Sequence, residues 1–280
     1  MTRVHLVDAS PYLFRAFFSL PRTITGSDGK PVNAVYGFAQ FLSKYVEEEK
    51  PTHIGIAFDR HFNQSFRNDE YPPYKAQRDA SPPELDAQVD LAVAITQSLG
   101  MATFIDERYE ADDLIATVMH QTRASRAEYV IVTSDKDMTQ LVNDRVIVVD
   151  PARKLRFDAA AVEEKFGVRP DQMTDFLALA GDSVDNIPGV RGIGPKTAAD
   201  LLRRYGSLEG IYENVATMRQ SRKRSDLTMA AKLTEHVEMA GLSKRLATVS
   251  IEAPITVKLD DLRYEPAGDV RSLLARIRRG

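Results

Sequence analysis

The chain contains no cysteine, and it has no uninterrupted apolar run of the roughly 18 residues that a membrane span needs. Without cysteine, disulfide bonds and cysteine-ligated zinc are excluded. The N-terminus, MTRVHLVDAS, is charged early and passes straight into a strand-like run, so it lacks the apolar stretch and cleavage site of a signal peptide. The five histidines show no metal-ligand spacing. These absences fit a cytoplasmic protein with no membrane partner.

What the chain does contain is enough apolar sequence for a real core. Its 280 residues, 43% of them hydrophobic, predict one large domain or two modest ones. The formal net charge of −3 looks wrong for a nucleic-acid binder. Leaving out nine clustered acids sets 37 bases against 31 remaining acids, so the rest of the surface is mildly basic.

Those nine acids lie at the ends of the most hydrophobic runs or in tight clusters. VHLVD ends at Asp8, HIGIAFD at Asp59 and EYVIVTSD at Asp135. The others open a helix or lie in short polar turns: Asp137, Glu110, Asp112, Asp113, Asp182 and Asp185. In an open parallel sheet, ligands bind beyond the carboxyl ends of the strands, so these acids are expected to converge. Converging anions repel one another unless cations hold them, and all-oxygen sites select Mg²⁺ or Mn²⁺. Metal-dependent phosphoryl chemistry is therefore the leading hypothesis.

Each acid taken alone has an ordinary structural explanation. Asp8 and Asp59 could each cap a helix after a βα turn, and acids in a first helical turn are favoured by the helix dipole. Asp182 and Asp185, spaced i, i+3, would lie side by side on one helical turn, or could build a turn through side-chain hydrogen bonds. It is the combination across several strands that favours a shared site.

The chain alternates strand-like and helical patterns. Apolar runs at 4–8, 54–58, 129–133 and 146–149 alternate with helical patterns, which predicts an α/β fold with a mostly parallel central sheet flanked by helices. The helices are expected at 34–49, at 84–99 and from Ala111, whose apolar face carries Ala111, Leu114, Ile115, Val118 and Met119. After about residue 165 the strands stop, so we expect an α/β core over 1–165 and a helical region over 166–280.

Three segments do not fit a plain sheet-and-helix pattern. Residues 60–83 are polar, aromatic and proline-rich, and a long insertion after a strand is more often functional than accidental. The basic run at 219–224 reads as a solvated loop, and the C-terminal residues read as one last amphipathic helix.

A glycine-rich turn, GVRGIGPKTA, opens a helix at 195. Glycines let a backbone approach a phosphate, and amides at a helix N-terminus bind it. Gly189, Gly192, Gly194 and Lys196 therefore form a candidate phosphate site. The dinucleotide fingerprint is not met, and a helix-hairpin-helix for DNA backbone binding is the stronger interpretation. A purely structural turn between helices is the alternative.

The motifs together resemble one family. LVDASPYLFRAFFS, AFDRHFNQSFRNDEYPPYKAQRD, YEADDLIATV, VTSDKDMTQLV, ALAGDSVDNIPGVRGIGPKTAADLL and the DLRYEP tail occur in one order over nearly the whole length. This chain is similar to the 5′→3′ exonuclease and flap endonuclease family, the relatives of the N-terminal nuclease domain of bacterial DNA polymerase I. It resembles a stand-alone member.

The resemblance implies a fold with particular parts. These are a PIN-like nuclease core, a helical arch over 60–83 and a C-terminal helix-three-turn-helix, with its helix-hairpin-helix-like motif at 182–202. It implies that Arg67, Tyr74, Lys75 and Arg78 lie in the arch. There Tyr74 would stack a base, Arg67 would bind DNA, and Lys75 and Arg78 would act on the scissile phosphate.

The resemblance also implies two metal sites. Asp8, Asp59, Glu110, Asp112 and Asp135 would surround the first ion, and Asp135, Asp137, Asp182 and Asp185 the second, with Asp113 outside them. The cofactor is expected to be Mg²⁺, with Mn²⁺ as a substitute and K⁺ at the 189–194 hairpin. The partner is expected to be DNA with a 5′ flap, a nick or a free 5′ end, bound by a monomer.

The resulting hypothesis is a structure-specific 5′ nuclease using a two-metal-ion mechanism. A catalytically weak, structure-specific DNA-binding protein is the alternative, but it would not explain nine acids in a protein that approaches polyanionic DNA. An aspartyl phosphatase needs a second aspartate two residues after the first, and Ser10 stands there instead.

Overall fold

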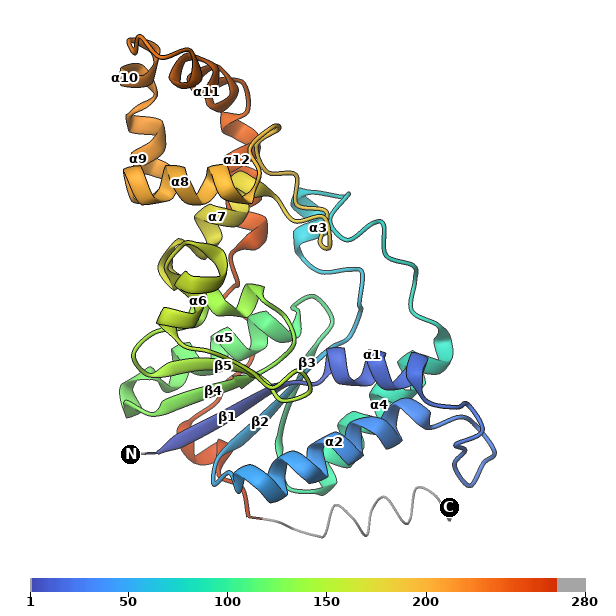
Figure 1. Cartoon of the computed structure of the whole chain (residues 1–280). Coiled ribbons are helices and arrows are strands. Elements are labelled where there is room, and N and C mark those ends of the chain that lie inside the picture. The colour runs from blue at the N-terminus through green and yellow to red at the C-terminus, as the bar shows by residue number, and fades with distance from the viewer. Residues whose placement is uncertain (1, 266–280) are drawn as a thin grey trace.

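Six strands form one sheet at the centre of the molecule, in a computed structural model that describes residues 2–265 (Figure 1). The strands are β1 (Arg3–Asp8), β2 (Ile54–Asp59), β3 (Ala102–Asp106), β4 (Glu128–Val132), β5 (Val146–Asp150) and β6 (Leu155–Phe157). Their order is β3-β2-β1-β4-β5-β6, and only the β5–β6 pair is antiparallel. The predicted α/β class with a mostly parallel sheet is confirmed.

The predicted strands all form, to within two residues at each end. Strands β1 and β4 are buried along almost their whole length because helices cover both faces of the sheet. The prediction missed β3, whose residues are all half-buried at the sheet edge, and the three-residue β6. In β1, Val7 pairs with Ile56 of β2 and with Val132 of β4, so these three strands end at one edge.

Helices α1 (Ser10–Ser19), α2 (Asn33–Glu49) and α4 (Pro83–Ser98) cover one face of the sheet (Figure 1). Their buried side chains, Phe38 and Leu42 among them, pack on Ile54 and Phe58 of β2 in one cluster. Helices α1 and α2 approach closely because residue 37 is glycine, where an added Cβ would lie 2.5 Å from the Cβ of Ala16.

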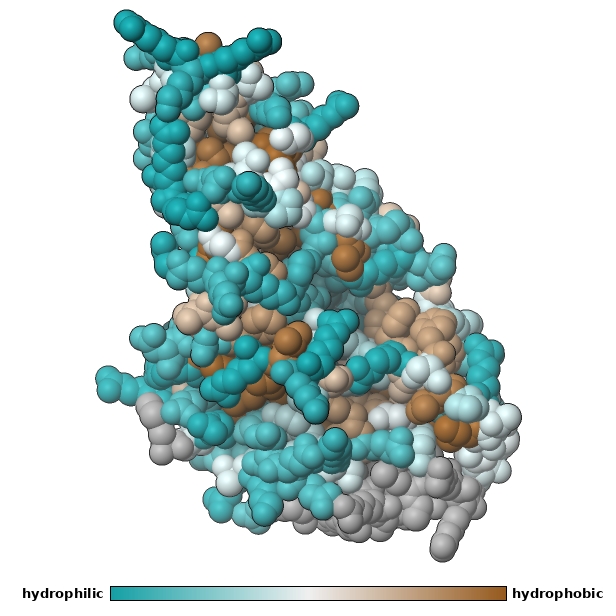
Figure 2. Space-filling model, viewed as in Figure 1, coloured by the Kyte–Doolittle hydropathy of each residue, from teal (hydrophilic) through white to brown (hydrophobic). Residues whose placement is uncertain are grey.

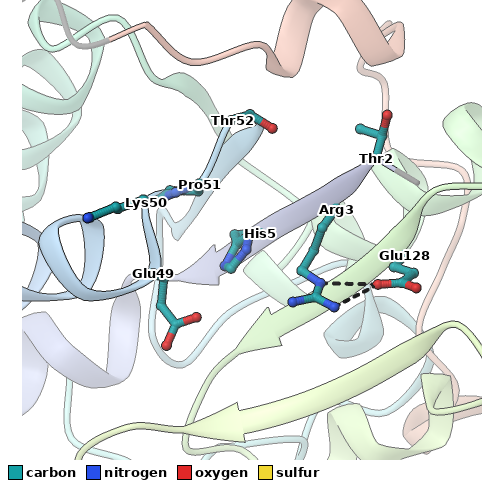
Figure 3. Close-up of a pocket in the computed structure, with 8 residues that line it drawn as sticks. All are labelled: Thr2, Arg3, His5, Glu49, Lys50, Pro51, Thr52 and Glu128. Atoms are coloured by element: carbon teal, nitrogen blue, oxygen red, sulfur yellow. Dashed lines mark hydrogen bonds and ion pairs between the residues drawn. The ribbon is translucent and has the colours of Figure 1, made fainter.

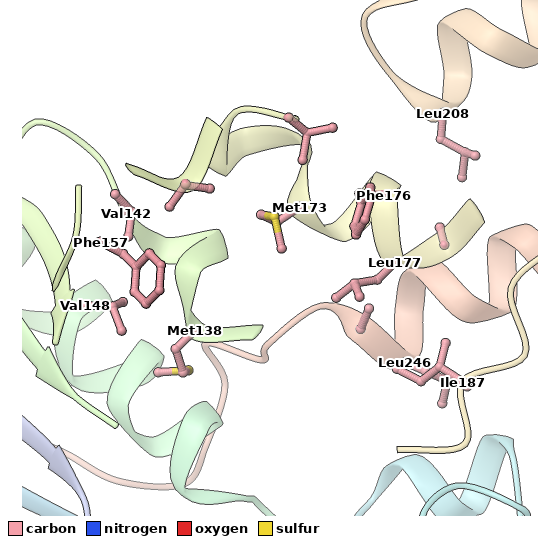
Figure 4. Close-up of a cluster of buried hydrophobic side chains, with 14 of the residues drawn as sticks. Met138, Val142, Val148, Phe157, Met173, Phe176, Leu177, Ile187, Leu208 and Leu246 are labelled. Atoms are coloured by element: carbon pink, nitrogen blue, oxygen red, sulfur yellow. The ribbon is translucent and has the colours of Figure 1, made fainter. Parts of the chain in front are cut away.

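The other face carries α5 (Ala111–Thr122) and then the helical part of the chain. One hydrophobic cluster runs from the sheet into that part, through Met138, Phe157, Met173, Leu177 and Leu246 (Figure 4). The larger helices beyond the sheet are α6 (Ala159–Phe166), α7 (Met173–Ala180), α8 (Pro195–Tyr205), α9 (Leu208–Glu213), α10 (Val215–Arg219), α11 (Arg224–Glu235) and α12 (Val237–Ala247). Because this core is continuous, the helical part is packed firmly onto the sheet.

Short 3₁₀ segments complete the chain: η1 (Arg123–Ser125), η2 (Asp137–Leu141), η3 (Pro170–Gln172) and η4 (Leu259–Leu262). The basic run near 222 is exposed, as expected of a solvated loop. The last predicted amphipathic helix lies outside the described residues. Within residues 2–265, no helix combines the length and the apolar character that crossing a bilayer requires.

The segment over 60–83 differs from its prediction. We expected a helical arch, but its only helix is α3 (Arg67–Glu70), and turns make up most of the rest. Pro72, Pro73, Pro82 and Pro83 explain this, because proline removes a helical donor and restricts the residue before it.

Candidate functional site

Two acidic side chains end the neighbouring strands β1 and β2. Asp8 is 4% exposed, and its carboxylate accepts hydrogen bonds from the Ser10 amide (3.1 Å) and the Thr133 hydroxyl (2.8 Å). The Asp59 carboxylate accepts the Ala111 amide at 2.6 Å. These bonds join the ends of three strands to the start of α5, so both carboxylates are fixed at one sheet edge.

The first turn of α5 brings further acids to this edge. Glu110 is the N-cap residue and forms a capping box with Asp113, whose carboxylate accepts the Glu110 amide at 3.1 Å. Asp113 is fully buried and forms a two-bond ion pair with Arg67, with both N–O distances 2.8 Å. Both oxygens of Asp113 are thus bonded to protein groups of the chain, namely Arg67 and the Glu110 amide.

The loop after β4 supplies Asp135 and Asp137. The Asp135 amide donates to the Thr133 hydroxyl (3.0 Å), and the Asp137 amide donates to the Asp135 carboxylate (2.8 Å). Lys136 lies among the acids: its ammonium is 3.3 Å from Asp137 and also contacts Asp182. One oxygen of Asp137, Oδ1, is buried and accepts no hydrogen bond, and the charge beside it is the Lys136 ammonium.

Asp182 and Asp185 lie on the connection between α7 and α8. We considered a helical turn for them, but the chain forms a tight hairpin in which Asp182 and Ile187 exchange backbone hydrogen bonds of 2.9 and 2.7 Å. The Asp182 side chain accepts the Val184 amide at 2.8 Å, which is the side-chain turn named as the alternative. Asn186, with φ 57°, closes the hairpin.

These acids do converge in space. Glu110, Asp112, Asp137 and Asp185 line one small cavity of ≈ 10 Å³, room for about one water-sized particle. Burial raises the pKa of Asp112 well above its ordinary value, and the charges of Asp135, Asp8, Asp59 and Glu110 raise it further. Burial likewise raises the pKa of Asp137, to about 8, with Asp135 adding to the effect. The carboxylates of this cluster therefore repel one another when all of them are ionised.

A hard divalent cation would relieve this repulsion, and the all-oxygen donor set suits one. In this structure, protein cations lie between the acids. No three acidic or histidine side chains within residues 2–265 are already arranged as a finished ion site. Two observations fit a bound metal: Oδ1 of Asp137 is buried and accepts no hydrogen bond, and the pKa values of Asp112 and Asp137 are raised.

Lys75 and Arg78 reach these acids from the 60–83 segment. The Lys75 ammonium lies 2.8 Å from Glu110 and 3.6 Å from Asp185, and Arg78 contacts Asp185. Burial would raise the pKa of Glu110, but Lys75 and Arg67 outweigh it and hold that pKa at about 2. Both predicted catalytic cations are thus at the acid cluster.

Tyr74 and Arg67 lie elsewhere than their predicted roles require. Tyr74 is 2% exposed, and its hydroxyl donates to Asp185 (3.1 Å), so its ring is not free to stack on a base. Arg67 is 4% exposed, and besides Asp113 its guanidinium donates to the carbonyls of Leu246 (2.9 Å) and Thr248 (3.0 Å). Both side chains are thus buried and bonded to protein groups.

The glycine hairpin lies where α8 begins. Gly189 and Gly192 have φ values of 64° and 79°, which a residue with a side chain adopts rarely, and Gly194 is the N-cap of α8. The Gly192 carbonyl accepts the Lys232 ammonium at 2.9 Å. Lys196 is exposed on the first turn of α8. The glycine-rich connection therefore joins α7 to α8, and its role as a helix-hairpin-helix for DNA stays a prediction.

An exposed aromatic pair lies on α1, the helix that starts two residues after Asp8. Phe14 and Phe18 are 47% and 62% exposed, with ring centroids 4.7 Å apart. In Figure 2 most of the visible face is hydrophilic, and hydrophobic side chains gather at the level of α1. The sequence reading missed these residues, because a phenylalanine in an amphipathic helix is ordinarily expected in the core.

Sequence reasoning also missed the residues that position the acids. Ser10, Thr133 and Lys136 lie beside predicted acids in the chain, and each donates a hydrogen bond to a predicted acid. The signal was present in the DAS and VTSDKD motifs, where a hydroxyl precedes or follows an acid by two residues.

Comparison with known proteins agrees with this geometry. Residues 3–167 match the family model described as the 5′-3′ exonuclease N-terminal resolvase-like domain, and residues 168–269 match that of the 5′-3′ exonuclease C-terminal SAM fold. The chain is 39% identical over 268 residues to DNA polymerase I of Rhizobium leguminosarum, and 39% identical over 264 residues to that of Caldicellulosiruptor bescii. These matches cover 93% and 92% of this chain but 26% and 30% of the relatives, so it spans less than a third of their length.

Solved structures share the fold. A bacteriophage T5 flap endonuclease in a complex with DNA and metal ions superposes with a TM-score of 0.70 at 19% identity, covering 98% of this chain and 99% of that one. The catalytic core of Rad2 with a DNA substrate gives a TM-score of 0.64 at 13% identity, covering 99% and 86%.

Proposed function

The chain belongs to the 5′-3′ exonuclease family, and from that premise we propose that it is a structure-specific 5′ nuclease hydrolysing DNA phosphodiester bonds near 5′ ends. One observation carries the proposal. Carboxylates from β1, β2, α5, the loop after β4 and the 182–188 hairpin meet at one sheet edge, beside Lys75 and Arg78. Such a concentration of buried acids is costly to the fold, so it indicates a function.

The proposed metal ligands fall into two groups that share Asp135. Asp8, Asp59, Glu110, Asp112 and Asp135 would hold one divalent ion, and Asp135, Asp137, Asp182 and Asp185 a second. We propose Mg²⁺, with Mn²⁺ as a substitute, because the donors are all oxygen. When bound, such ions lower the pKa of water and stabilise charge on the attacking and leaving oxygens.

The cations of the chain would act on the phosphate. Lys75 and Arg78 now neutralise Glu110 and Asp185, so both side chains already reach the place where a scissile phosphate would lie. There they would stabilise the charge that develops on its oxygens. Phe14 and Phe18 offer exposed rings on which unpaired bases could stack, beside a hollow of ≈ 250 Å³ lined partly by Phe14 and Ser134.

The glycine hairpin would hold the duplex through its backbone. Gly192 and Gly194 are exposed where α8 begins, and Lys196 adds a charge there, whereas Gly189 is buried and its amide donates to Ser243. A K⁺ ion at this hairpin would have to share the Gly192 carbonyl with the Lys232 ammonium. Because these contacts are to phosphates, DNA structure and not sequence would be recognised.

We propose a cytoplasmic monomer whose substrates are DNA with a 5′ flap, a nick or a free 5′ end. The test uses a 5′-labelled flap, a nicked duplex and a duplex with a blocked 5′ end, each with Mg²⁺ or with EDTA. We expect Mg²⁺-dependent products from the first two substrates. Tight binding without cleavage at any Mg²⁺ or Mn²⁺ concentration would instead establish the DNA-binding alternative.

A further inference from the structure

The end of α12 and the residues after it, 246–250, are hydrogen-bonded to side chains that lie beside the acids. Arg67 donates to the carbonyls of Leu246 and Thr248, and the Asp113 carboxylate accepts the Ser250 amide at 2.6 Å. Gln140 of η2 donates to the Ala247 carbonyl at 3.0 Å. It also accepts the Val249 amide at 3.1 Å. Each residue from 246 to 250 thus makes one hydrogen bond to a side chain beside the acid cluster.

The other anchor on α12 belongs to the glycine hairpin. The hydroxyl of Ser243, which is fully buried, accepts the Gly189 amide at 3.0 Å. Ser243 and Leu246 are three residues apart on one helix, a rise of about 4.5 Å. The Leu246 side chain also lies beside Ile187 of the 182–188 hairpin in the shared core (Figure 4). Less than one turn of α12 therefore separates its contact with the hairpin from its contacts with the acids.

This arrangement fixes the glycine hairpin relative to the carboxylates of the sheet. A nuclease that recognises structure must select one phosphodiester, and successive phosphates of one strand are spaced about 3.4 Å apart along the axis of the duplex. A misplacement of about 1 Å at a reacting centre already costs about 100-fold in rate. The distance between the duplex contact and the acids must therefore be held to a fraction of that repeat.

We infer that α12 with its exit segment, residues 243–250, is the spacer that determines which phosphodiester is cut, with Ser243 and Gln140 as its positioning residues. The inference rests on the proposed nuclease function. Neither side chain needs to touch DNA or metal for this role. Ser243 holds the hairpin to the helix, and Gln140 holds the helix exit to the loop that bears Asp135 and Asp137.

The experiment measures product lengths at single-nucleotide resolution from a 5′-labelled flap, under single-turnover conditions. We compare the parent protein with Ser243→Ala, Gln140→Met and the double variant. We expect the share of products cut one nucleotide to either side of the main position to rise about fivefold in each single variant, and further in the double variant. Binding of the same flap in Ca²⁺ should change less than about twofold.

The chain offers matched controls for both substitutions. Gln121 of α5 makes the same two-bond clamp on the Ile255 carbonyl (2.7 Å) and the Val257 amide (2.8 Å), near the other end of the sheet. The buried hydroxyl of Thr117 accepts the Ala253 amide at 3.1 Å. Gln121→Met and Thr117→Val should lower the melting temperature by a similar amount while leaving product lengths unchanged.

The outcomes separate the inference from the proposed function. No cleavage by the parent protein would contradict the nuclease proposal itself. Cleavage with unchanged product lengths in the Ser243 and Gln140 variants would overturn the spacer. The spacer would also be overturned if the Gln121 and Thr117 controls spread the product lengths equally. Any loss of stability would then produce the effect.

Discussion

The two ends of the sheet contrast sharply. At the carboxyl end of the strands, buried acids surround a cavity of ≈ 10 Å³. At the opposite end lies a far larger hollow, ≈ 750 Å³ (Figure 3), lined by Thr2, Arg3, His5, Glu49, Lys50, Pro51, Thr52 and Glu128. Its main charge contact, Arg3 with Glu128 at 2.9 Å, joins side chains that are 60% and 36% exposed, where water screens the charges.

The comparison shows that volume is a poor guide to chemistry here. The large hollow has balanced charges, and its ion pair is satisfied. Around the small cavity the acids are buried close to one another, and this burial and repulsion raise the pKa values of Asp112 and Asp137. Such perturbed groups are typical of functional sites. Substitutions at the two ends should therefore behave in opposite ways.

The largest effect is expected from Asp135→Asn. Cleavage should fall by about a thousandfold or more because Asp135 is shared by both proposed metal groups. Flap binding in Ca²⁺, measured by fluorescence anisotropy, should stay within a few-fold. In metal-free buffer the variant should melt at a higher temperature, since burial and the Asp185 charge raise the pKa of Asp135 and an amide carries no charge to bury or repel.

The matching change at the other end is Glu128→Gln, which should leave cleavage within about twofold of the parent. Substantial Mg²⁺-dependent cleavage by the Asp135 variant, or a comparable loss from the Glu128 variant, would remove the contrast between the two ends.

Next in size is Lys75→Ala. We expect the single-turnover rate to fall about a hundredfold, while flap affinity changes less than about threefold, because Lys75 would stabilise charge that develops only during reaction. Quench-flow kinetics and equilibrium binding separate the two quantities. An affinity loss larger than the rate loss would make Lys75 a binding residue instead.

A smaller effect, on stability alone, is expected from His5. Burial, with Arg3 adding to it, lowers the pKa of His5 to about 4, and its ring bonds the Tyr45 hydroxyl at 2.6 Å. The unfolded chain, with a pKa near 6.5, binds this proton more readily than the folded one. The stabilising contribution of neutral His5, roughly 3 kcal/mol, is therefore complete above about pH 6.5 and is lost as pH falls towards 4.

His5→Gln should flatten that part of the pH dependence without altering cleavage at pH 7.5. Urea unfolding of both proteins at pH 7, 6 and 5 measures the difference. Parallel stability curves for the two proteins would show that His5 does not titrate in this range.

The smallest effect is expected from Arg3→Ala. This exposed ion pair should contribute less than about 1 kcal/mol to the free energy of unfolding, and less at high salt. Denaturant titrations at low and high ionic strength provide the check. A loss above 2 kcal/mol would show that water does not screen the ion pair between Arg3 and Glu128.

Much of the sheet and of the acid cluster was predictable because both depend on local pattern. An apolar run that ends in aspartate shows where a parallel strand stops, and strands that run the same way end at the same edge. That reasoning placed Asp8, Asp59 and Asp135 correctly at one edge.

The burial of Arg67 could not be read from the sequence. Arginine is rarely buried unless it is paired, and its partner Asp113 lies 46 residues away. The same holds for Gln140 and Ser243, whose backbone partners lie 107 and 54 residues away, respectively. Edge strand β3 was missed because half-buried residues leave no clear alternation.

Gly181 and Gly189 flank the hairpin that presents Asp182 and Asp185, and their backbones lie against each other. A methyl group on Gly189 would lie 2.4 Å from the Gly181 nitrogen, and one on Gly181 would lie 2.6 Å from the Ile187 oxygen. Two residues without a functional group thus constrain the placement of two acids as firmly as any ligand could. A search for inactivating substitutions confined to charged positions would overlook them.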